Sequence, residues 1–363
     1  MAEDTGSKKR KLDDAGIMSH GDEAEVVITR RCETLWFEDG NIILVADGIG
    51  FKLYKGILTR HSPLFNSMFT LPQPNDSPTV DGCMVVIVHD PPDELEEFLL
   101  ALYDSSASYF SNDKTLKFNT VKAMLSLGSK YDVDHIREEA IRRLRQCFPD
   151  ELDSYVTPHT CYKIRKEGPE HYYLRSSVNG RLEDCIAAIL LANEHHLDHL
   201  LPAAFYACAQ LDNQTLIEGY LDDRSVRWQL SPQDLNRVLE GQRILRNRDI
   251  RAYQCLLDGT RVEPKDVGKA CRHPGDMCIS YMISSYVDLF EKFYTRHHAL
   301  LDSDRLENKL SNWDLFCSAC KKDVKTVFNG HRRTTWESLR TIFDVEVPAA
   351  AAETSAIAAG GGE

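Results

Sequence analysis

Cysteines near the C-terminal end form the clearest pattern for chemistry in this sequence. Cys317 and Cys320 have the C-x-x-C spacing that lets two thiolates reach one zinc ion from a single turn. A structural zinc site needs four ligands, and Cys271 and Cys278 are the natural second pair. The six residues between Cys271 and Cys278 are a wider gap than a zinc knuckle prefers. A structural zinc site is therefore one interpretation of this spacing, with one well-spaced pair and one looser pair.

Two other interpretations of these cysteines stay open. His273 or His331 could replace a member of the second pair, and buried reduced cysteines also behave as small apolar residues without any metal. A redox-active C-x-x-C motif needs a helix start after a strand to lower a thiol pKa, and we predict no strand before Cys317. The sequence predicts no cofactor, with a structural zinc ion as the one alternative.

The other candidate motifs for metal binding, phosphate binding and catalysis lack residues that each motif requires. His195, His196 and His199 offer metal ligands one helical turn apart, but no glutamate follows the first histidine as in H-E-x-x-H, so we interpret them as structural. The stretch from Asp47 to Gly50 lacks the longer glycine spacing and the following Lys-Ser/Thr of a phosphate loop. No G-x-S-x-G occurs. We therefore expect a protein that is not an enzyme.

Composition limits the class of protein. The 363 residues allow two domains, or one domain with a helical extension. A formal net charge of −13 argues against direct nucleic-acid binding, which needs clustered Lys and Arg. We find no apolar run near the ~20 residues that span a bilayer and no secretory signal. We expect a soluble intracellular protein of the nucleus or cytoplasm, with its 11 cysteines reduced.

A basic cluster lies inside the polar N-terminal tail, residues 1–25. It consists of Lys8, Lys9, Arg10 and Lys11. Four consecutive cations on a flexible arm suit the acidic grooves of nuclear import receptors. The alternative is a solvated charge run in a disordered tail.

The most strongly patterned stretch is 41–69. Ile42 to Ala46 predicts a strand, and Asp47-Gly48 is the pair that best accepts the positive φ angles of a two-residue hairpin turn. A second strand follows at Phe51 to Leu53. Val26 to Thr29 is a candidate for a short additional strand before the hairpin.

Two short helices follow the hairpin. Ser62-Pro63 ends the first and starts the second, because proline fits a first helical turn and breaks an interior. The second helix has a broad apolar face formed by Leu64, Phe65, Met68 and Phe69, and we expect Leu64, Phe65 and Phe69 to belong to the core.

The rest of the chain is mostly helical in pattern. A third strand and three amphipathic helices complete a first domain at 31–147, with Asp90 as the expected cap of the first of these helices. Residues 148–180 are a predicted linker or insert, 181–346 a helical C-terminal region, and 347–363 a disordered tail. Ser231-Pro232 marks a helix start in that region.

The order of these elements resembles the BTB/POZ domain. The resemblance rests on segments 36–44 (WFEDGNIIL), 51–58 (FKLYKGIL) and 61–65 (HSPLF), and it is closest to the large BTB group of basidiomycete fungi. Residues 331–339 (HRRTTWESL) are similar to the C-terminal sequence of that group. The resemblance implies an α+β fold, in which a small mixed sheet flanked by helices precedes a mostly α-helical region.

The resemblance also implies partners. BTB domains bind a second copy or another protein, and some relatives join a cullin scaffold as substrate adaptors of ubiquitin ligases. We expect a protein–protein interaction module that self-associates as a homodimer and binds partners, with a cullin substrate adaptor as one role that it could have. The alternative is a nuclear transcriptional or chromatin co-regulator. Asn41 and Tyr54 stand where many dimeric relatives place Asp and His, so the usual charged dimer pocket is not expected here.

Overall fold

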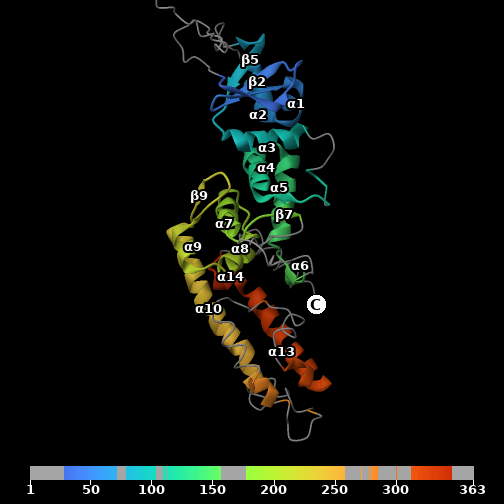
Figure 1. Cartoon of the computed structure of the whole chain (residues 1–363), viewed down its shortest axis with the longest axis vertical. Helices are drawn as coiled ribbons and strands as arrows, with labels where there is room; N and C mark the ends of the chain where they lie inside the picture. Colours follow the sequence, from blue (N-terminus) through green and yellow to red (C-terminus); the bar gives the residue numbers. More distant parts are fainter. Residues whose placement is uncertain are drawn as a thin grey trace, which may run out of the picture. The chain divides into compact units, whose positions relative to one another are not determined.

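A computed structural model describes residues 28–71, 79–103, 109–111, 113–156, 177–257, 271, 278, 280–284, 300 and 312–345. The chain divides into two compact units (Figure 1). The first comprises Met1–Lys114 and Asn119–Ile141, and the second Thr115–Phe118 and Arg142–Glu363. The basic cluster at Lys8 to Lys11 lies outside the described residues.

The first unit is built on a five-stranded mixed sheet of order β1-β3-β2-β5-β4. Its strands are β1 (Arg30–Trp36), β2 (Ile42–Ala46), β3 (Ile49–Leu53), β4 (Thr79–Val80) and β5 (Cys83–Ile87). β2 pairs antiparallel with β3 and parallel with β5, while β1 pairs parallel with β3. The β2 residues are buried on both faces, as their apolar run predicts.

The predicted hairpin is confirmed. Ile42 pairs with Leu53 and Ala46 with Ile49, which leaves Asp47 and Gly48 as the two turn residues. Their φ angles are 43° and 77°, both in the left-handed region that a two-residue turn of this kind requires. Strand β1 runs from Arg30 to Trp36, which the sequence analysis did not predict. In the candidate strand at 26–29, Ile28 and Thr29 precede β1, while Val26 and Val27 lie outside the described residues.

Five helices belong to this part of the chain: α1 (Lys55–His61), α2 (Pro63–Thr70), α3 (Pro92–Tyr103), α4 (Phe118–Lys130) and α5 (Asp134–Cys147). Ser62 ends α1 and caps α2, where its Oγ accepts from the Phe65 N–H at 3.0 Å. The same hydroxyl donates to the Tyr131 carbonyl at 2.5 Å. Asp90 was expected to cap α3, but its buried carboxylate accepts from Lys130 Nζ and from the Tyr131 hydroxyl.

The second unit is mainly helical. Its described elements include α6 (Leu152–Val156), α7 (Asp184–Glu194), α8 (Leu201–Cys208), α9 (Asn213–Glu218), α10 (Pro232–Leu257), η2 (Trp313–Leu315), α13 (Ser318–Glu337) and α14 (Leu339–Ile342). Two small strand pairs join them, β6 (Leu116–Lys117) with β7 (Val178–Asn179) and β8 (Tyr220–Leu221) with β9 (Arg227–Trp228). Ser231 starts α10 as predicted, since its Oγ accepts from the Asp234 N–H at 3.1 Å.

The long helix α10 organises the core of this unit by packing against α8, α13 and α14 (Figure 1). Phe343, just after α14, is fully buried and stacks on Phe205 of α8 with 5.5 Å between ring centroids. Gly241 of α10 makes room for the Phe343 ring, because a Cβ added there would lie 2.1 Å from Cε1 of Phe343. The α+β fold with a helical second region is therefore confirmed.

The short helix α9 provides a pH-dependent contact. Asp212 caps it, accepting from the Thr215 N–H at 2.9 Å and from the Thr215 hydroxyl at 2.8 Å. These two bonds favour the carboxylate and lower the pKa of Asp212. We expect Asp212→Ala to lower the free energy of unfolding by about 1 kcal/mol at neutral pH.

The sign of the pH dependence follows from that lowered pKa. The cap stabilises the fold above the unfolded-state pKa of about 3.9, and its contribution is lost as the pH falls through the lower folded-state pKa. Urea unfolding monitored by tryptophan fluorescence measures the free energy of unfolding. The difference in this free energy between wild type and Asp212→Ala should become smaller as the pH is lowered. Asp212→Asn is the control, because its amide oxygen still caps the helix without titrating. A gap independent of pH would contradict this assignment.

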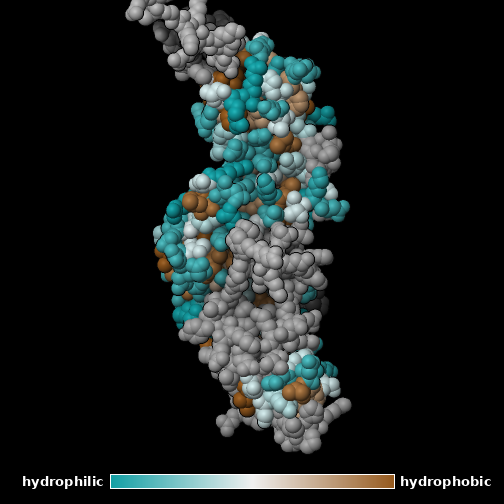
Figure 2. Space-filling model, viewed as in Figure 1, coloured by the Kyte–Doolittle hydropathy of each residue, from teal (hydrophilic) through white to brown (hydrophobic). Residues whose placement is uncertain are grey.

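No helix among the described residues is both long enough and apolar enough to cross a bilayer. The coloured surface in Figure 2 is mostly hydrophilic on the face drawn, and its hydrophobic residues lie in small, separate groups. The described cysteines are free thiols.

Candidate functional site

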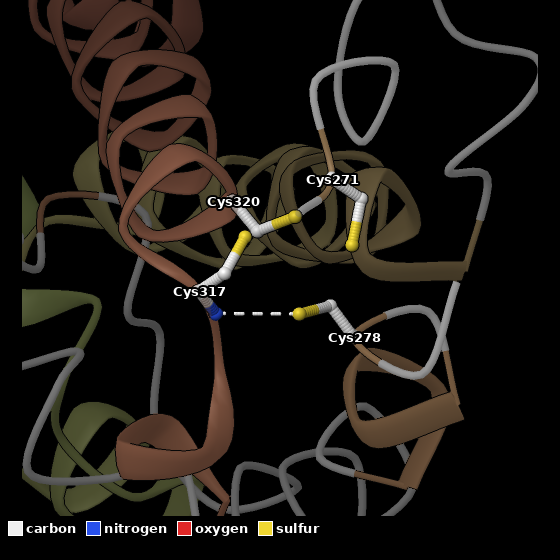
Figure 3. A group of neighbouring side chains, drawn as sticks. All are labelled: Cys271, Cys278, Cys317 and Cys320. Carbon is white, nitrogen blue, oxygen red and sulfur yellow. Dashed lines mark hydrogen bonds between the residues drawn. The ribbon is translucent and has the colours of Figure 1, made fainter. Parts of the chain in front are cut away.

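The structure brings together the four cysteines that the sequence singled out. The Sγ atoms of Cys271, Cys278, Cys317 and Cys320 all lie within 4.8 Å of one another. Figure 3 shows the side chains converging, with Cys317 and Cys320 at the start of α13. His331 is eleven residues beyond Cys320 on α13, about 16 Å along the helix axis, so it cannot replace a member of this group. His273 lies outside the described residues.

The surroundings of the cysteine cluster are apolar. The cluster belongs to a core with buried Met282, Trp313, Phe316, Val324 and Phe328. Burial is the main cause that raises the pKa of the Cys278 and Cys320 thiols, and the neighbouring thiols raise it further. The backbone N–H of Cys317 donates to Cys278 Sγ at 3.3 Å, and this bond favours the thiolate. The raised pKa values favour the protonated thiols of Cys278 and Cys320.

The candidate histidines are engaged in the local fold. His195 ends α7, and His196 adopts a φ of 55° in the turn that follows. His199 Nε2 accepts from Arg145 Nε at 2.9 Å, and burial followed by the charge of Arg145 lowers the pKa of this histidine. In the part of the chain that the structure describes, these histidines belong to no group of metal ligands.

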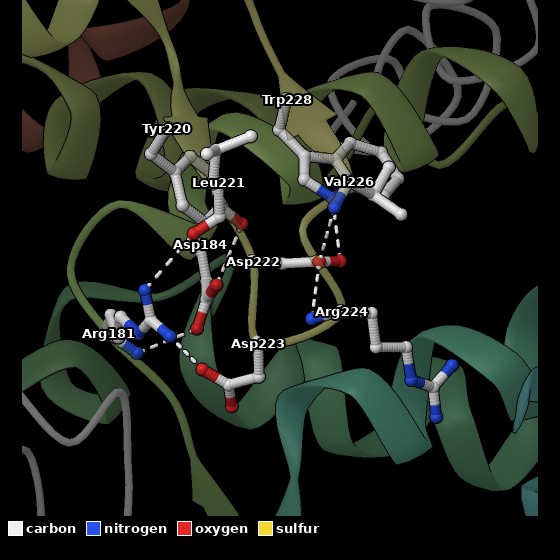
Figure 4. A network of polar contacts seen from close by, with 9 residues as sticks. All are labelled: Arg181, Asp184, Tyr220, Leu221, Asp222, Asp223, Arg224, Val226 and Trp228. Atoms are coloured by element: carbon white, nitrogen blue, oxygen red, sulfur yellow. Dashed lines mark hydrogen bonds and ion pairs between the residues drawn. The ribbon is translucent and has the colours of Figure 1, made fainter.

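A polar network that the sequence analysis missed surrounds the β8–β9 hairpin (Figure 4). The carboxylate of buried Asp184 accepts from the Tyr220 hydroxyl at 2.7 Å and from the Arg181 N–H at 2.6 Å. Asp222 accepts from the N–H groups of Arg224 and Val226, both at 2.9 Å.

Further contacts extend this network. Asp222 also accepts from Trp228 Nε1 at 3.1 Å, and Arg181 pairs with Asp223. Burial raises the pKa of Asp184, and burial together with the Asp184 charge raises that of Tyr220. Because these carboxylates are occupied by groups of the hairpin and by Arg181, we assign the network to folding. The Asp-Asp-Arg-Ser run at 222–225 was the signal for it, since Asp favours such turns.

In the first unit, the two positions that depart from the charged dimer pocket serve the domain itself. Asn41 Oδ1 accepts from the Lys55 N–H at 2.7 Å and so satisfies a free donor at the start of α1. The Tyr54 hydroxyl donates to Asp39 Oδ1 at 2.5 Å, and the Tyr103 hydroxyl bonds both the N–H and the carbonyl of Tyr54. Burial raises the pKa of Tyr103 to about 12.

Comparison with known families identifies a domain in the N-terminal part of the chain. The family model of the BTB/POZ domain matches residues 38–147, which contain β2 to β5 and α1 to α5, whereas β1 precedes the matched residues. Residues 38–147 form a BTB/POZ domain. No curated protein matches the chain.

Helix α2 carries the most exposed apolar stripe of the BTB domain among its described helices. Phe65 and Phe69 are buried, and Phe65 stacks on Tyr131 with 4.3 Å between centroids. Leu64 was expected in this core as well, but that prediction was wrong: it is 38% exposed, because it lies about 100° around the helix from Phe65. Leu64 and half-buried Met68 lie four residues apart on α2, and Leu71, the C-cap residue that follows Thr70, continues their spacing.

BTB domains are interaction modules, so a protein–protein interaction role follows for this chain in general terms. The chemistry available on the α2 stripe is apolar contact. Pro63–Thr70 contains no charged residue, although charged residues make up 27% of the chain. Depletion of charge is typical of the core of protein interfaces.

Proposed function

We propose that this chain is a non-enzymatic adaptor that self-associates through the α2 stripe of its BTB domain, formed by Leu64, Met68 and Leu71. The observation that carries the proposal is the exposure of two leucines, 38% for Leu64 and 63% for Leu71, on a segment without charges. A helix whose exposed face remains in contact with water would be expected to carry charged side chains on that face.

A second copy of the chain is the occupant that we propose for this stripe. Two copies related by a two-fold axis would place the same apolar residues against each other, since such an interface is self-complementary. Polar but uncharged Asn66, Ser67 and Thr70 are exposed beside the stripe and would form its rim.

Leu64→Glu is expected to weaken self-association by at least about 100-fold, equivalent to about 2.8 kcal/mol. The two-fold axis would bring two carboxylates into one apolar contact, where each loses its hydration without gaining a cation. Sedimentation velocity of the full chain over a concentration series measures the effect.

Leu239→Glu is the matched control for that experiment. Leu239 is a helical leucine of α10 with 37% exposure, against 38% for Leu64. The control should retain the wild-type dissociation constant. Equal weakening by both variants, or a wild-type chain that stays monomeric at all concentrations, would reject the proposed interface.

The role that we propose for this assembly is a substrate adaptor of a cullin-based ubiquitin ligase. The support is the resemblance to BTB proteins that bind a cullin scaffold through this domain. The helical second unit would then be available to bind the substrate. Affinity capture with the full chain should recover a cullin, and failure to recover one would reject this role.

A nuclear transcriptional or chromatin co-regulator is the second candidate, supported by the basic run Lys8 to Lys11 in the sequence. The net charge of −13 argues against direct DNA contact, so this role needs a DNA-binding partner. Recovery of chromatin proteins in place of a cullin, together with loss of nuclear accumulation when these four residues are replaced by alanine, would favour this candidate.

A further inference from the structure

The geometry points to a structural zinc ion bound by Cys271, Cys278, Cys317 and Cys320 in the second unit. In a tetrahedral site with Zn–S bonds of about 2.3 Å, neighbouring sulfurs lie about 3.8 Å apart. The four Sγ atoms are already within 4.8 Å of one another, so each pair needs to approach by no more than about 1 Å. Side-chain rotations can supply such a change.

The ligands come from two separate parts of the chain, as in many structural zinc sites. Cys317 is the residue before α13 and Cys320 lies in its first turn, so the pair approaches the centre from a helix N-terminus. Cys271 and Cys278 approach from the other side (Figure 3). The ion would therefore join two segments that are 39 residues apart, from Cys278 to Cys317.

Positive charge near the cluster would stabilise the negative charge of such a centre. Four thiolates around Zn²⁺ carry a net charge of −2, which the positive end of the α13 dipole favours. Lys321 and Lys322 directly follow Cys320 and add two cations nearby. The Cys317 N–H bond to Cys278 Sγ, at 3.3 Å, is the kind of hydrogen bond that stabilises a metal-bound thiolate.

The alternative is that the four thiols are apolar core residues. Two features favour the metal. Three of the four cysteines are buried, and the Sγ atoms of all four converge on one point, as the ligands of a tetrahedral zinc ion do. The surrounding Trp313, Phe316 and Phe328 would exclude water from the ion, as the shell of a structural site does. Zinc would supply folding free energy to this small core.

The first test needs no substitution. The full chain, purified with a thiol reductant and without added chelator, should contain a single zinc ion by elemental mass spectrometry. Alkylation mapped by peptide mass spectrometry should spare these four cysteines, and a strong zinc chelator should make all four reactive together. Absence of zinc, or labelling that the chelator does not change, would overturn the assignment.

The second test identifies the ligands. Cobalt added to the metal-free chain should give the absorption of a tetrahedral tetrathiolate centre, and Cys320→Ser should abolish stoichiometric zinc binding. Cys185→Ser is the control, since Cys185 is a fully buried thiol of the same unit outside the cluster. Zinc retained by Cys320→Ser, or lost equally from both variants, would contradict the four-cysteine site. If Cys320→Ser does not fold, the cobalt spectrum of the wild-type chain decides.

Discussion

Lys122→Met is expected to lower the free energy of unfolding of the BTB domain by about 3–5 kcal/mol. Lys122 on α4 is buried, and its Nζ lies 3.0 Å from Glu94 Oε1 on α3, with side-chain exposures of 3% and 15%. Methionine fills a similar volume and keeps the packing, so the loss is mainly electrostatic. The Glu94 carboxylate would stay largely shielded from water without this cation.

A double-mutant cycle separates this electrostatic cost from lost packing. Glu94→Gln should restore much of the stability lost in Lys122→Met, because a neutral side chain needs no cation. Arg137→Met is the control, since Arg137 pairs with Asp134 at exposures of 43% and 69% and should cost less than about 1 kcal/mol. Urea unfolding monitored by circular dichroism gives the values. Equal effects of Lys122→Met and Arg137→Met would show that the buried pair has no special role.

Phe343→Ala is expected to lower the free energy of unfolding of the second unit by about 3–5 kcal/mol. The Phe343 ring is fully buried, stacks on Phe205 and fills the space left by Gly241 of α10. Alanine would leave a cavity at the point where three helices meet, and close packing does not allow the surrounding backbone to collapse into it.

The Gly241–Phe343 contact offers its own control. Gly241→Ala alone should cost about 1–3 kcal/mol, because the new methyl group would overlap the ring. In the Phe343→Ala background the same change should be neutral or stabilising by up to about 1 kcal/mol, since alanine is the better helix former. Tryptophan fluorescence in urea measures both. If the losses in free energy of unfolding caused by Gly241→Ala and Phe343→Ala are additive in the double variant, the direct contact is contradicted.

The parts of the BTB domain predicted well are those with local causes. Asp47-Gly48 accepts the required positive φ angles, and Ser62-Pro63 separates two helices by a cap and a ring constraint that act within four residues. The strand at Arg30–Trp36 was not predicted, because its buried residues do not alternate and its partner β3 lies beyond the hairpin. Its position depends on tertiary pairing, which periodicity does not contain.

The candidate site also combines a feature with a local cause and features that depend on tertiary packing. The C-x-x-C spacing of Cys317 and Cys320 is local and was recognised directly. The approach of Cys271 and Cys278 was a hypothesis from composition, because packing across 39 residues decides it. Nor could the sequence show that Leu64 is exposed: on a helix with four apolar residues, the rest of the domain determines which of them face its core.

The central claim is that the BTB domain of this chain associates with a second copy through the α2 stripe. Hydrogen–deuterium exchange of the full chain, at concentrations above and below the association midpoint, tests it most directly. Peptides covering 63–71 should exchange more slowly at the higher concentration, and Leu64→Glu should remove that difference. Association of the chain with unchanged exchange across 63–71 would contradict the claim.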